Sequence, residues 1–140
     1  MEFIDKIHEG ARKAGKKIIL PEGETPRVLK AVESIIKKNL CLPVILGDPR
    51  KIRDISKEQG IDIDKAEIID NRYGKQLDKY ISLYCEIRKH KNIREDEAKK
   101  LISQSPVFYA ALGVRAGDFD GFVAGSSTTT RDVAKAAIYC

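Results

Sequence analysis

The sequence predicts an α/β protein in which helices cover both faces of a mostly parallel sheet, a three-layer α/β/α architecture. Short apolar runs alternate along the chain with longer stretches whose apolar residues recur every three or four positions. Glycine follows several of these runs, and proline behind a hydroxyl or carboxylate residue marks several helix starts. Strands separated by helices connect through right-handed crossovers and therefore run parallel. The 140 residues suffice for one domain.

The first elements expected are a helix, a strand and a second helix. In residues 3–14 the apolar side chains recur at helical spacing, and Gly15 follows as a helix C-cap. Residues 17–21 form an apolar run of the length of a buried strand. Thr25 and Pro26 then predict a helix start, with the threonine hydroxyl as N-cap and proline at the first helical position.

A second strand and helix follow the same plan. Residues 42–47 are expected to form a strand, but Pro43 cannot donate to a sheet ladder and predicts a weaker or edge position for it. Asp48 and Pro49 repeat the arrangement of an N-cap and a first-turn proline. The helix that they open is expected to end near Gly60.

The rest of the chain continues this alternation. The apolar pattern predicts two further strands, at 67–70 and 121–124, and four further helices, at 75–89, 96–102, 105–117 and 132–139. Ser105 and Pro106 again supply a cap and a first-turn proline. Ligands of parallel sheets bind outside the carboxyl ends of the strands, which is where Gly23, Gly47 and Gly125 are expected.

Composition argues against several classes of protein. The sequence is 42% hydrophobic and 34% charged, without a low-complexity tract, which is not typical of a disordered or collagen-like chain. No apolar run approaches the ~18 residues of a membrane span, and the first residues do not resemble a signal peptide. Cys41, Cys85 and Cys140 form no C-x-x-C pair, and with only two histidines we expect no metal site. Scattered cysteines favour a cytoplasmic setting.

The charge pattern gives little support for a nucleic-acid partner. The net charge of +5 is spread along the predicted helices, and 88–91 is the only dense basic cluster. We interpret the excess as solvated helix faces, or as attraction for anionic ligands. Neither a nucleic acid nor a membrane is expected as a partner.

The segment 120–132 carries the main functional signal. A short apolar run ends at Gly125, five hydroxyl residues follow, and a helical pattern then begins. Such a turn commonly binds phosphate, because backbone N–H groups and the positive end of the helix dipole point at the anion. Residues 126–129 are therefore candidates for binding phosphate, and the alternative is that they cap the last helix. The segment is not a Walker A loop, since it lacks the G-K-[ST] ending.

Five segments resemble those of phosphate acetyltransferases (phosphotransacetylases), in the same order and at about the same spacing. They are Lys17–Gly23, Pro26–Ala31, Arg88–Lys91, Ser105–Tyr109 and Gly117–Asp132. The resemblance implies reversible acyl transfer, in which acetyl-CoA and phosphate give acetyl phosphate and CoA. It also implies an α/β/α fold similar to that of isopropylmalate dehydrogenase. CoA is then a substrate, and no cofactor is implied.

The same resemblance implies that residues 1–140 are the N-terminal part of the first of two domains. Members of the family are more than twice as long, form homodimers and bind their substrates in a cleft between the domains. The fold would then be truncated here, without the second domain and the C-terminal helices that return to the first. The catalytic groups are expected in that missing part, so we expect the 140-residue chain to be inactive alone.

The resemblance transfers binding roles to four residues. Arg88 matches an arginine implicated in holding CoA, whose phosphates suit a guanidinium fork, and the alternative is a surface arginine beside a helix C-terminus. Ser127 and Thr129 would donate hydrogen bonds to phosphate or CoA. Lys135 stands in place of a family arginine, which keeps the charge but loses the two-pronged geometry. Its alternative is an exposed lysine on the last helix.

Other residues that could take part in catalysis are assigned structural roles, and two alternatives to a phosphate acetyltransferase stay open. Glu22 is interpreted as a turn carboxylate, His90 as an exposed side chain and Cys85 as core packing, so no protein nucleophile is expected. One rival is a phosphate butyryltransferase. The other is a non-catalytic CoA- or phosphate-binding or assembly module, which the change from the usual Arg-Pro to Lys135-Ala136 favours.

Overall fold

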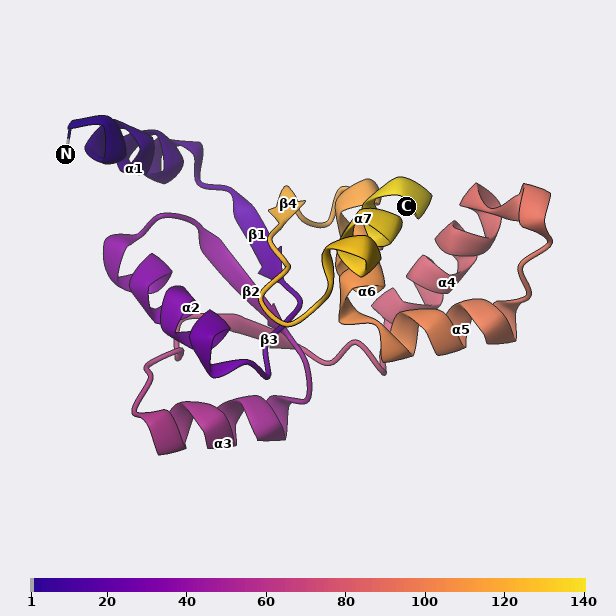
Figure 1. The fold of residues 1–140 in the computed structure, drawn as a ribbon, viewed down its shortest axis with the longest axis horizontal. Coiled ribbons are helices and arrows are strands. Elements are labelled where there is room, and N and C mark those ends of the chain that lie inside the picture. Colours follow the sequence, from indigo (N-terminus) through magenta and orange to yellow (C-terminus); the bar gives the residue numbers. More distant parts are fainter. Residues whose placement is uncertain (1) are drawn as a thin grey trace.

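A computed structural model describes residues 2–140 and contains every helix and strand that the sequence predicts (Figure 1). The helices are α1 (Glu2–Ala14), α2 (Pro26–Lys38), α3 (Pro49–Gln59), α4 (Lys75–Ile87), the short 3₁₀ helix η1 (Lys89–Lys91), α5 (Glu95–Gln104), α6 (Pro106–Arg115) and α7 (Thr130–Tyr139). The strands are β1 (Lys17–Leu20), β2 (Leu42–Leu46), β3 (Glu67–Ile69) and β4 (Gly121–Phe122). None of the described helices is both long and apolar enough to cross a membrane.

The four strands form one parallel sheet in the order β3–β2–β1–β4. β1 lies in the interior, with Ile19 opposite Val44 of β2 on one side and opposite Phe122 of β4 on the other. The predicted parallel sheet is therefore confirmed. Because all strands run the same way, their carboxyl ends reach a common edge of the sheet.

β2 is an interior strand, so the edge position predicted from Pro43 is wrong. The N–H of Leu42 donates to the carbonyl of Lys16 on the β1 side, at 2.8 Å. Successive residues of a strand turn their N–H groups to opposite sides, so the nitrogen of Pro43 faces the β3 side. Pairing with β3 begins only at Val44. The missing N–H of proline therefore removes no hydrogen bond from the ladder.

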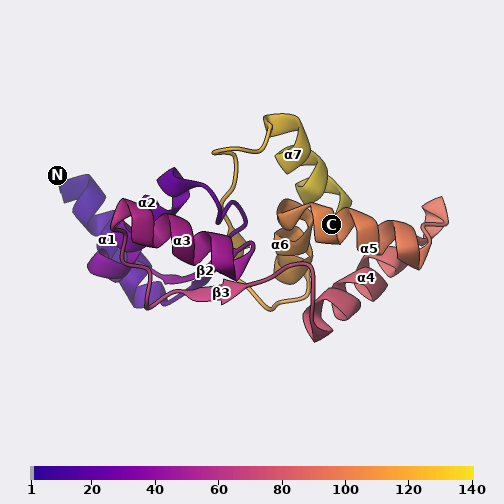
Figure 2. The same ribbon diagram turned by 90° about the horizontal axis from the view of Figure 1, so that it is seen from below.

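Each face of the sheet has its own apolar cluster. Ile19 and Val44 belong to a cluster that includes buried residues of α4, α5, α6 and α7. Leu20 and Ile45, which point the other way, pack with buried residues of α2 and α3. Figure 1 shows the sheet between these two groups of helices, and Figure 2 shows α4, α5, α6 and α7 gathered on one side of the molecule. The predicted three-layer α/β/α architecture is confirmed.

α6 joins the more distant helices to the sheet. Its residues Val107–Gly113 are all buried, as is typical of a helix in the centre of a core. The ring of Tyr109 meets that of Tyr80 in α4 edge to face, with 4.8 Å between the centroids. Phe108 meets Tyr84 in the same way at 6.0 Å. These aromatic contacts hold α4 against α6.

The predicted helix caps are confirmed at Asp48 and Ser105 but not at Thr25. The side chains of Asp48 and Ser105 accept hydrogen bonds from backbone N–H groups of the first helical turn, at 3.0 and 3.5 Å. Thr25 has the extended backbone of an N-cap, yet its side chain makes no capping bond. Its hydroxyl instead donates to the hydroxyl oxygen of Ser127, at 3.2 Å. The N–H groups of Val28 and Leu29 in the first turn donate to the backbone carbonyl of Thr25, at 3.0 and 3.1 Å, so the predicted bond to the threonine hydroxyl is absent.

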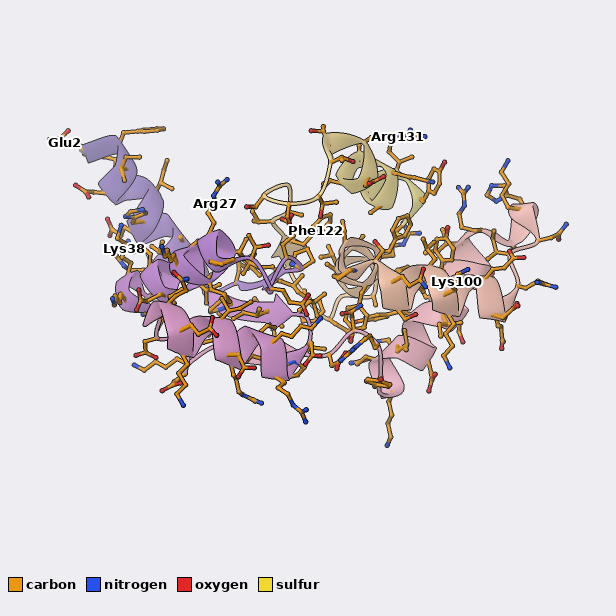
Figure 3. The ribbon with its side chains drawn as sticks, turned by 60° about the horizontal axis from the view of Figure 1, so that its bottom comes forward. Glu2, Arg27, Lys38, Lys100, Phe122 and Arg131 are labelled. Carbon is orange, nitrogen blue, oxygen red and sulfur yellow. The ribbon has the colours of Figure 1, made fainter. Side chains whose placement is uncertain are left out.

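α1 matches the first predicted helix, but its apolar side chains are exposed. Phe3 and Ile7 are 73% and 51% exposed. Figure 3 shows α1 standing out from the body of the molecule, with Glu2 at its outer end. The guanidinium of Arg12 donates to the carbonyl of Lys38 at the end of α2, at 2.8 Å.

Two helical glycines allow a matched test of packing around α6. A Cβ atom on Gly113 would lie 2.5 Å from two ring carbons of Phe119 and 3.0 Å from the hydroxyl oxygen of Tyr80. A Cβ on Gly10 in α1 would meet nothing within 4 Å. We expect Gly113→Ala to lower the free energy of unfolding by about 1–3 kcal/mol, despite the better helix propensity of alanine. Gly10→Ala is expected to be neutral or slightly stabilising. Urea denaturation of both variants is the measurement, and equal effects would contradict the tight packing at Gly113.

Candidate functional site

The carboxyl ends of β1 and β2 meet the loop that follows β4 at one edge of the sheet. Figure 1 shows this loop passing the end of β1 on its way to α7. A cavity of about 250 Å³ lies there. Its walls are formed by Pro21–Thr25, Leu46–Gly47, Pro106–Val107 and Ser127–Thr128. Parallel α/β proteins bind ligands at this edge, which makes it the first candidate site.

Glu22 lies just after β1, is only 8% exposed and places its carboxylate against this loop. One carboxylate oxygen accepts from the N–H groups of Gly125, at 2.7 Å, and Ser126, at 3.0 Å. The other accepts from the N–H of Ser127, from its hydroxyl at 2.8 Å, and from the N–H of Thr128 at 2.7 Å. The backbone N–H groups of residues 125–128 thus converge on one carboxylate, and we call them the amide cradle.

The amide cradle changes the acidity of Glu22. Burial alone would raise the pKa of this carboxyl group, but the hydrogen bonds from Ser127, Ser126 and Gly125 outweigh burial and lower the pKa from 4.5 to about 2. Within the described residues, Glu22 forms no ion pair with a lysine, arginine or histidine. Its negative charge is therefore stabilised by backbone and hydroxyl dipoles alone.

Two of the four predicted binding residues, Ser127 and Thr129, lie at this edge. Ser127 gives both its N–H and its hydroxyl to Glu22, and its hydroxyl oxygen accepts from Thr25. The hydroxyl oxygen of Thr129 accepts from the N–H of Asp132, at 3.2 Å, and caps α7. The alternative reading of this segment as a helix cap is thus confirmed for Thr129.

The other two predicted residues, Arg88 and Lys135, meet on a single aromatic ring. Arg88 caps the C-terminal end of α4, and its guanidinium carbon lies 4.1 Å from the centroid of the Tyr139 ring. The ammonium nitrogen of Lys135 lies 5.6 Å from the same centroid. Both are cation–π contacts. The Nε atom of Arg88 is buried and has no hydrogen-bond partner among the described residues.

The structure thus brings the four residues together in two pairs rather than in one place. Thr129 caps the start of α7, whereas Lys135 and Tyr139 lie further along the same helix. Lys135 comes six positions after the cap, which corresponds to a rise of about 9 Å. α7 therefore links the edge of the sheet to the two cations on Tyr139.

The sequence missed the roles of Glu22 and Tyr139. Glu22 does begin a turn, since the N–H of Thr25 donates to its carbonyl at 3.1 Å, but its side chain reaches a loop 103 residues away. Nothing local in the sequence signals that contact. Tyr139 stands four residues after Lys135, a spacing that places both on one face of a helix. That spacing is the signal that could have indicated a shared site.

The remaining candidates take the structural roles expected of them. His90 is exposed, and Cys85 is half-buried and packs against the larger apolar cluster. Burial raises the pKa of the Cys41 and Cys85 thiols and raises the pKa of the Cys140 thiol to about 12. A thiol in that state is a poor nucleophile near neutral pH. The described part of the chain holds no group of three or more histidine, cysteine, aspartate or glutamate side chains arranged for a metal ion.

Comparison with known proteins gives consistent matches. Residues 2–140 match the family model described as "Phosphate acetyl/butaryl transferase". The chain is 38% identical over 137 residues to a phosphate acetyltransferase of Thermoanaerobacterium thermosaccharolyticum, covering 98% of this chain and 41% of that protein. It is 29% identical over 127 residues to an NADP-dependent malic enzyme of Escherichia coli, covering 89% of this chain and 17% of that protein.

The fold matches those of solved structures equally well. A phosphotransacetylase from Streptococcus pyogenes superimposes with a TM-score of 0.91 at 25% identity. The match covers 99% of this chain and 41% of that protein. The chain therefore spans about two fifths of the length of the Thermoanaerobacterium and Streptococcus proteins.

The lowered pKa of Glu22 predicts how stability depends on pH. Because the pKa is lower in the folded state, the stabilisation is complete above pH 4.5 and is lost as the pH falls toward 2. The contribution at neutral pH is on the order of 3 kcal/mol. Glu22→Gln cannot titrate, so the difference in free energy of unfolding between wild type and this variant should shrink over that range. Urea denaturation from pH 7 to pH 2.5 measures the difference, and one that does not vary with pH would contradict the prediction.

The cap at Thr129 predicts a local loss of stability. Thr129→Ala removes the acceptor for the N–H of Asp132 and should destabilise the start of α7 by about 1 kcal/mol. Amide hydrogen exchange in the first turns of α7 should then become about fivefold faster. Thr129→Ser keeps the acceptor and should exchange as wild type does. Thr130→Ala, one residue further on, is the matched control, and an equal effect there would rule out the cap as the cause.

Proposed function

This chain belongs to the phosphate acetyl/butaryl transferase family, and from that premise we propose that it supplies part of the substrate site of a phosphate acetyltransferase. The proposed reaction is reversible transfer of an acetyl group between CoA and phosphate. The observation that carries the proposal is the family match over residues 2–140. The half-buried Arg88 with an unused donor, beside Lys135 on one ring, supports a binding site for an anionic substrate.

The proposal includes the rest of the protein, because this chain spans only 41% of the phosphate acetyltransferase of Thermoanaerobacterium thermosaccharolyticum and 41% of the phosphotransacetylase from Streptococcus pyogenes. Residues 1–140 would form the N-terminal part of the first of two domains, similar to the isopropylmalate dehydrogenase-like fold. The complete protein would be a homodimer with acetyl-CoA, acetyl phosphate and phosphate as substrates, and without a cofactor. Its setting would be the cytoplasm, which the three free cysteines favour.

Within this proposal, Arg88 and Lys135 hold the phosphate groups of CoA. A guanidinium can donate two parallel hydrogen bonds to a phosphate, whereas an ammonium acts as a compact charge. Both cations lie over the ring of Tyr139, which covers one side of each. Neither cation has a carboxylate within ion-pairing distance in the described residues, so an anionic ligand need not displace one.

The chemical step implied by the family needs no protein nucleophile. A base removes the proton from the CoA thiol, the sulfur attacks the acetyl carbonyl, and the bond to phosphate breaks as phosphate leaves. Cations and N–H donors near the carbonyl stabilise the oxyanion that develops. The raised pKa values of the three protein thiols agree with a reaction in which the nucleophilic sulfur belongs to CoA. We assign the base to a part of the protein outside this chain.

A second candidate function is a non-catalytic module that binds CoA or phosphate. The similarity to a protein named as a malic enzyme favours it, because segments of this kind also occur in proteins named for another reaction. A phosphate butyryltransferase is the other alternative, since the family description covers both transferases. Assays of the protein as its native source makes it, with acetyl phosphate and with butyryl phosphate, separate the three functions. A binding module transfers neither acyl group, and a phosphate butyryltransferase prefers butyryl phosphate.

Titration of CoA into this chain tests the binding site. Arg88→Ala should weaken CoA binding tenfold or more, and Lys135→Ala should weaken it less, since lysine contributes a single point contact. Arg94→Ala is the matched control, because Arg94 is already paired with Asp96 and Glu97. Calorimetry gives the dissociation constants. If Arg88→Ala binds CoA as tightly as the control does, the assigned site is wrong.

The 140-residue chain itself is expected to show no acetyl transfer. The measurement mixes the purified chain with acetyl phosphate and CoA and follows the formation of acetyl-CoA against a blank without protein. Formation above the blank would show that the base lies within residues 1–140, contrary to the proposal.

A further inference from the structure

We propose that Glu22 is a positioning residue whose carboxylate serves as the permanent anion of the amide cradle, which is therefore closed to the phosphate of a substrate. The loop that the sequence marks as a phosphate-binding turn would then be held in shape by an anion of the protein itself. The substrate anion is left to Arg88 and Lys135, the two cations on the ring of Tyr139. The binding of the substrate anion by these cations rests on the proposed function, whereas the occupation of the amide cradle by Glu22 does not.

The hydrogen bonds show that the cradle has no free donor. A carboxylate offers about four lone-pair positions, and here five donors converge on it. Four of them are consecutive backbone N–H groups, from Gly125 to Thr128. Gly125 has a φ of 119°, a conformation that L-residues rarely adopt, and it starts this run of converging amides. Such a concave run of N–H groups is an anion site by its geometry.

The charge of Glu22 reinforces this closure. Glu22 is 8% exposed, and no described cation forms an ion pair with it. A phosphate that approached the loop would meet an uncompensated negative charge in a poorly solvated place, at a site whose donors are all in use. The binding of a second anion beside the first is therefore unfavourable.

The same contact fixes where α7 begins. The cradle ends at Thr128, and the next residue, Thr129, caps α7. Glu22 follows the interior strand β1, so its carboxylate ties the start of α7 to the centre of the sheet. Lys135 lies in the second turn of that helix. Loss of the carboxylate should free the loop. The start of α7 would then no longer be fixed, and Lys135 would no longer be held over the ring of Tyr139.

Glu22→Ala in this chain makes the decisive variant. The substitution removes the atoms beyond Cβ, which are those of an acetate ion, and leaves the amide cradle empty. Added acetate should refill the cradle, raise the melting temperature of the variant and return the amide signals of residues 125–128 to their wild-type positions in NMR spectra. Acetamide has the same shape without the charge and should not do so. Equal effects of acetate and acetamide would overturn the proposal.

Two further measurements keep the test independent of how well that variant folds. Glu24→Ala, two residues along the same turn, is the control. Its exposed carboxylate accepts from the N–H of Asp48 at 3.3 Å and pairs with Lys51 at 3.9 Å, so this variant should show no response to acetate. In the wild-type chain, inorganic phosphate should move signals around Arg88 and Tyr139 and leave the amide signals of residues 125–128 unchanged. Movement of these amide signals at the lowest phosphate concentrations would show that the cradle is open, and would overturn the proposal.

Binding of CoA separates this inference from the proposed function. The Glu22→Ala variant should bind CoA at least tenfold more weakly than wild type and should regain most of that affinity in acetate. A merely structural role for Glu22 predicts no such recovery by a small anion. If the wild-type chain binds neither CoA nor phosphate, the proposed function fails, while the acetate experiment still decides whether Glu22 occupies an anion site.

Discussion

The buried carboxylate of Glu22 accepts hydrogen bonds from four successive backbone N–H groups and connects the first strand to the last helix. Glu22 follows the interior strand β1, and the loop that it holds leads from β4 into α7. The hydroxyl-rich segment therefore takes its shape from a group that lies far away in the sequence. Without that carboxylate the loop would present four converging amides to no partner, an arrangement that a folded protein rarely tolerates.

The rest of the architecture places this contact between two apolar cores. The sheet separates a smaller cluster under α2 and α3 from a larger one that includes α4, α5, α6 and α7. Residues Val107–Gly113 of α6 are buried, and the contact between Tyr109 and Tyr80 holds α4 against this helix. Arg88 at the end of α4 therefore has a fixed position relative to the sheet. On α7, the ring of Tyr139 lies against the guanidinium of Arg88, and Lys135 lies over the same ring. The cation pair thus depends on the packing of two helices that are distant in sequence.

Local chemistry was enough to predict the elements, the parallel sheet and most of the helix starts, because apolar periodicity and proline positions report on local structure. It failed at Pro43, where the register of β3 decided the outcome, and at Thr25, whose side chain bonds the distant hydroxyl of Ser127 and makes no capping bond. The same limit applies to Glu22, whose partners lie more than 100 residues away. Arg88 and Lys135 were found through resemblance, but only the structure shows that Tyr139 joins them.

The position of β4 in the sheet has a consequence for the order of folding. β1 can pair with β2 after a short connection, but its other neighbour and the partners of Glu22 come about a hundred residues later. The entropy cost of closing a loop grows with its length, so we expect β1 to pair with β2 before it pairs with β4. On a ribosome, β1, β2 and β3 would assemble while one side of β1 stays open. The carboxylate of Glu22 would stay ionised and hydrated until its partners, residues 125–128, have left the exit tunnel.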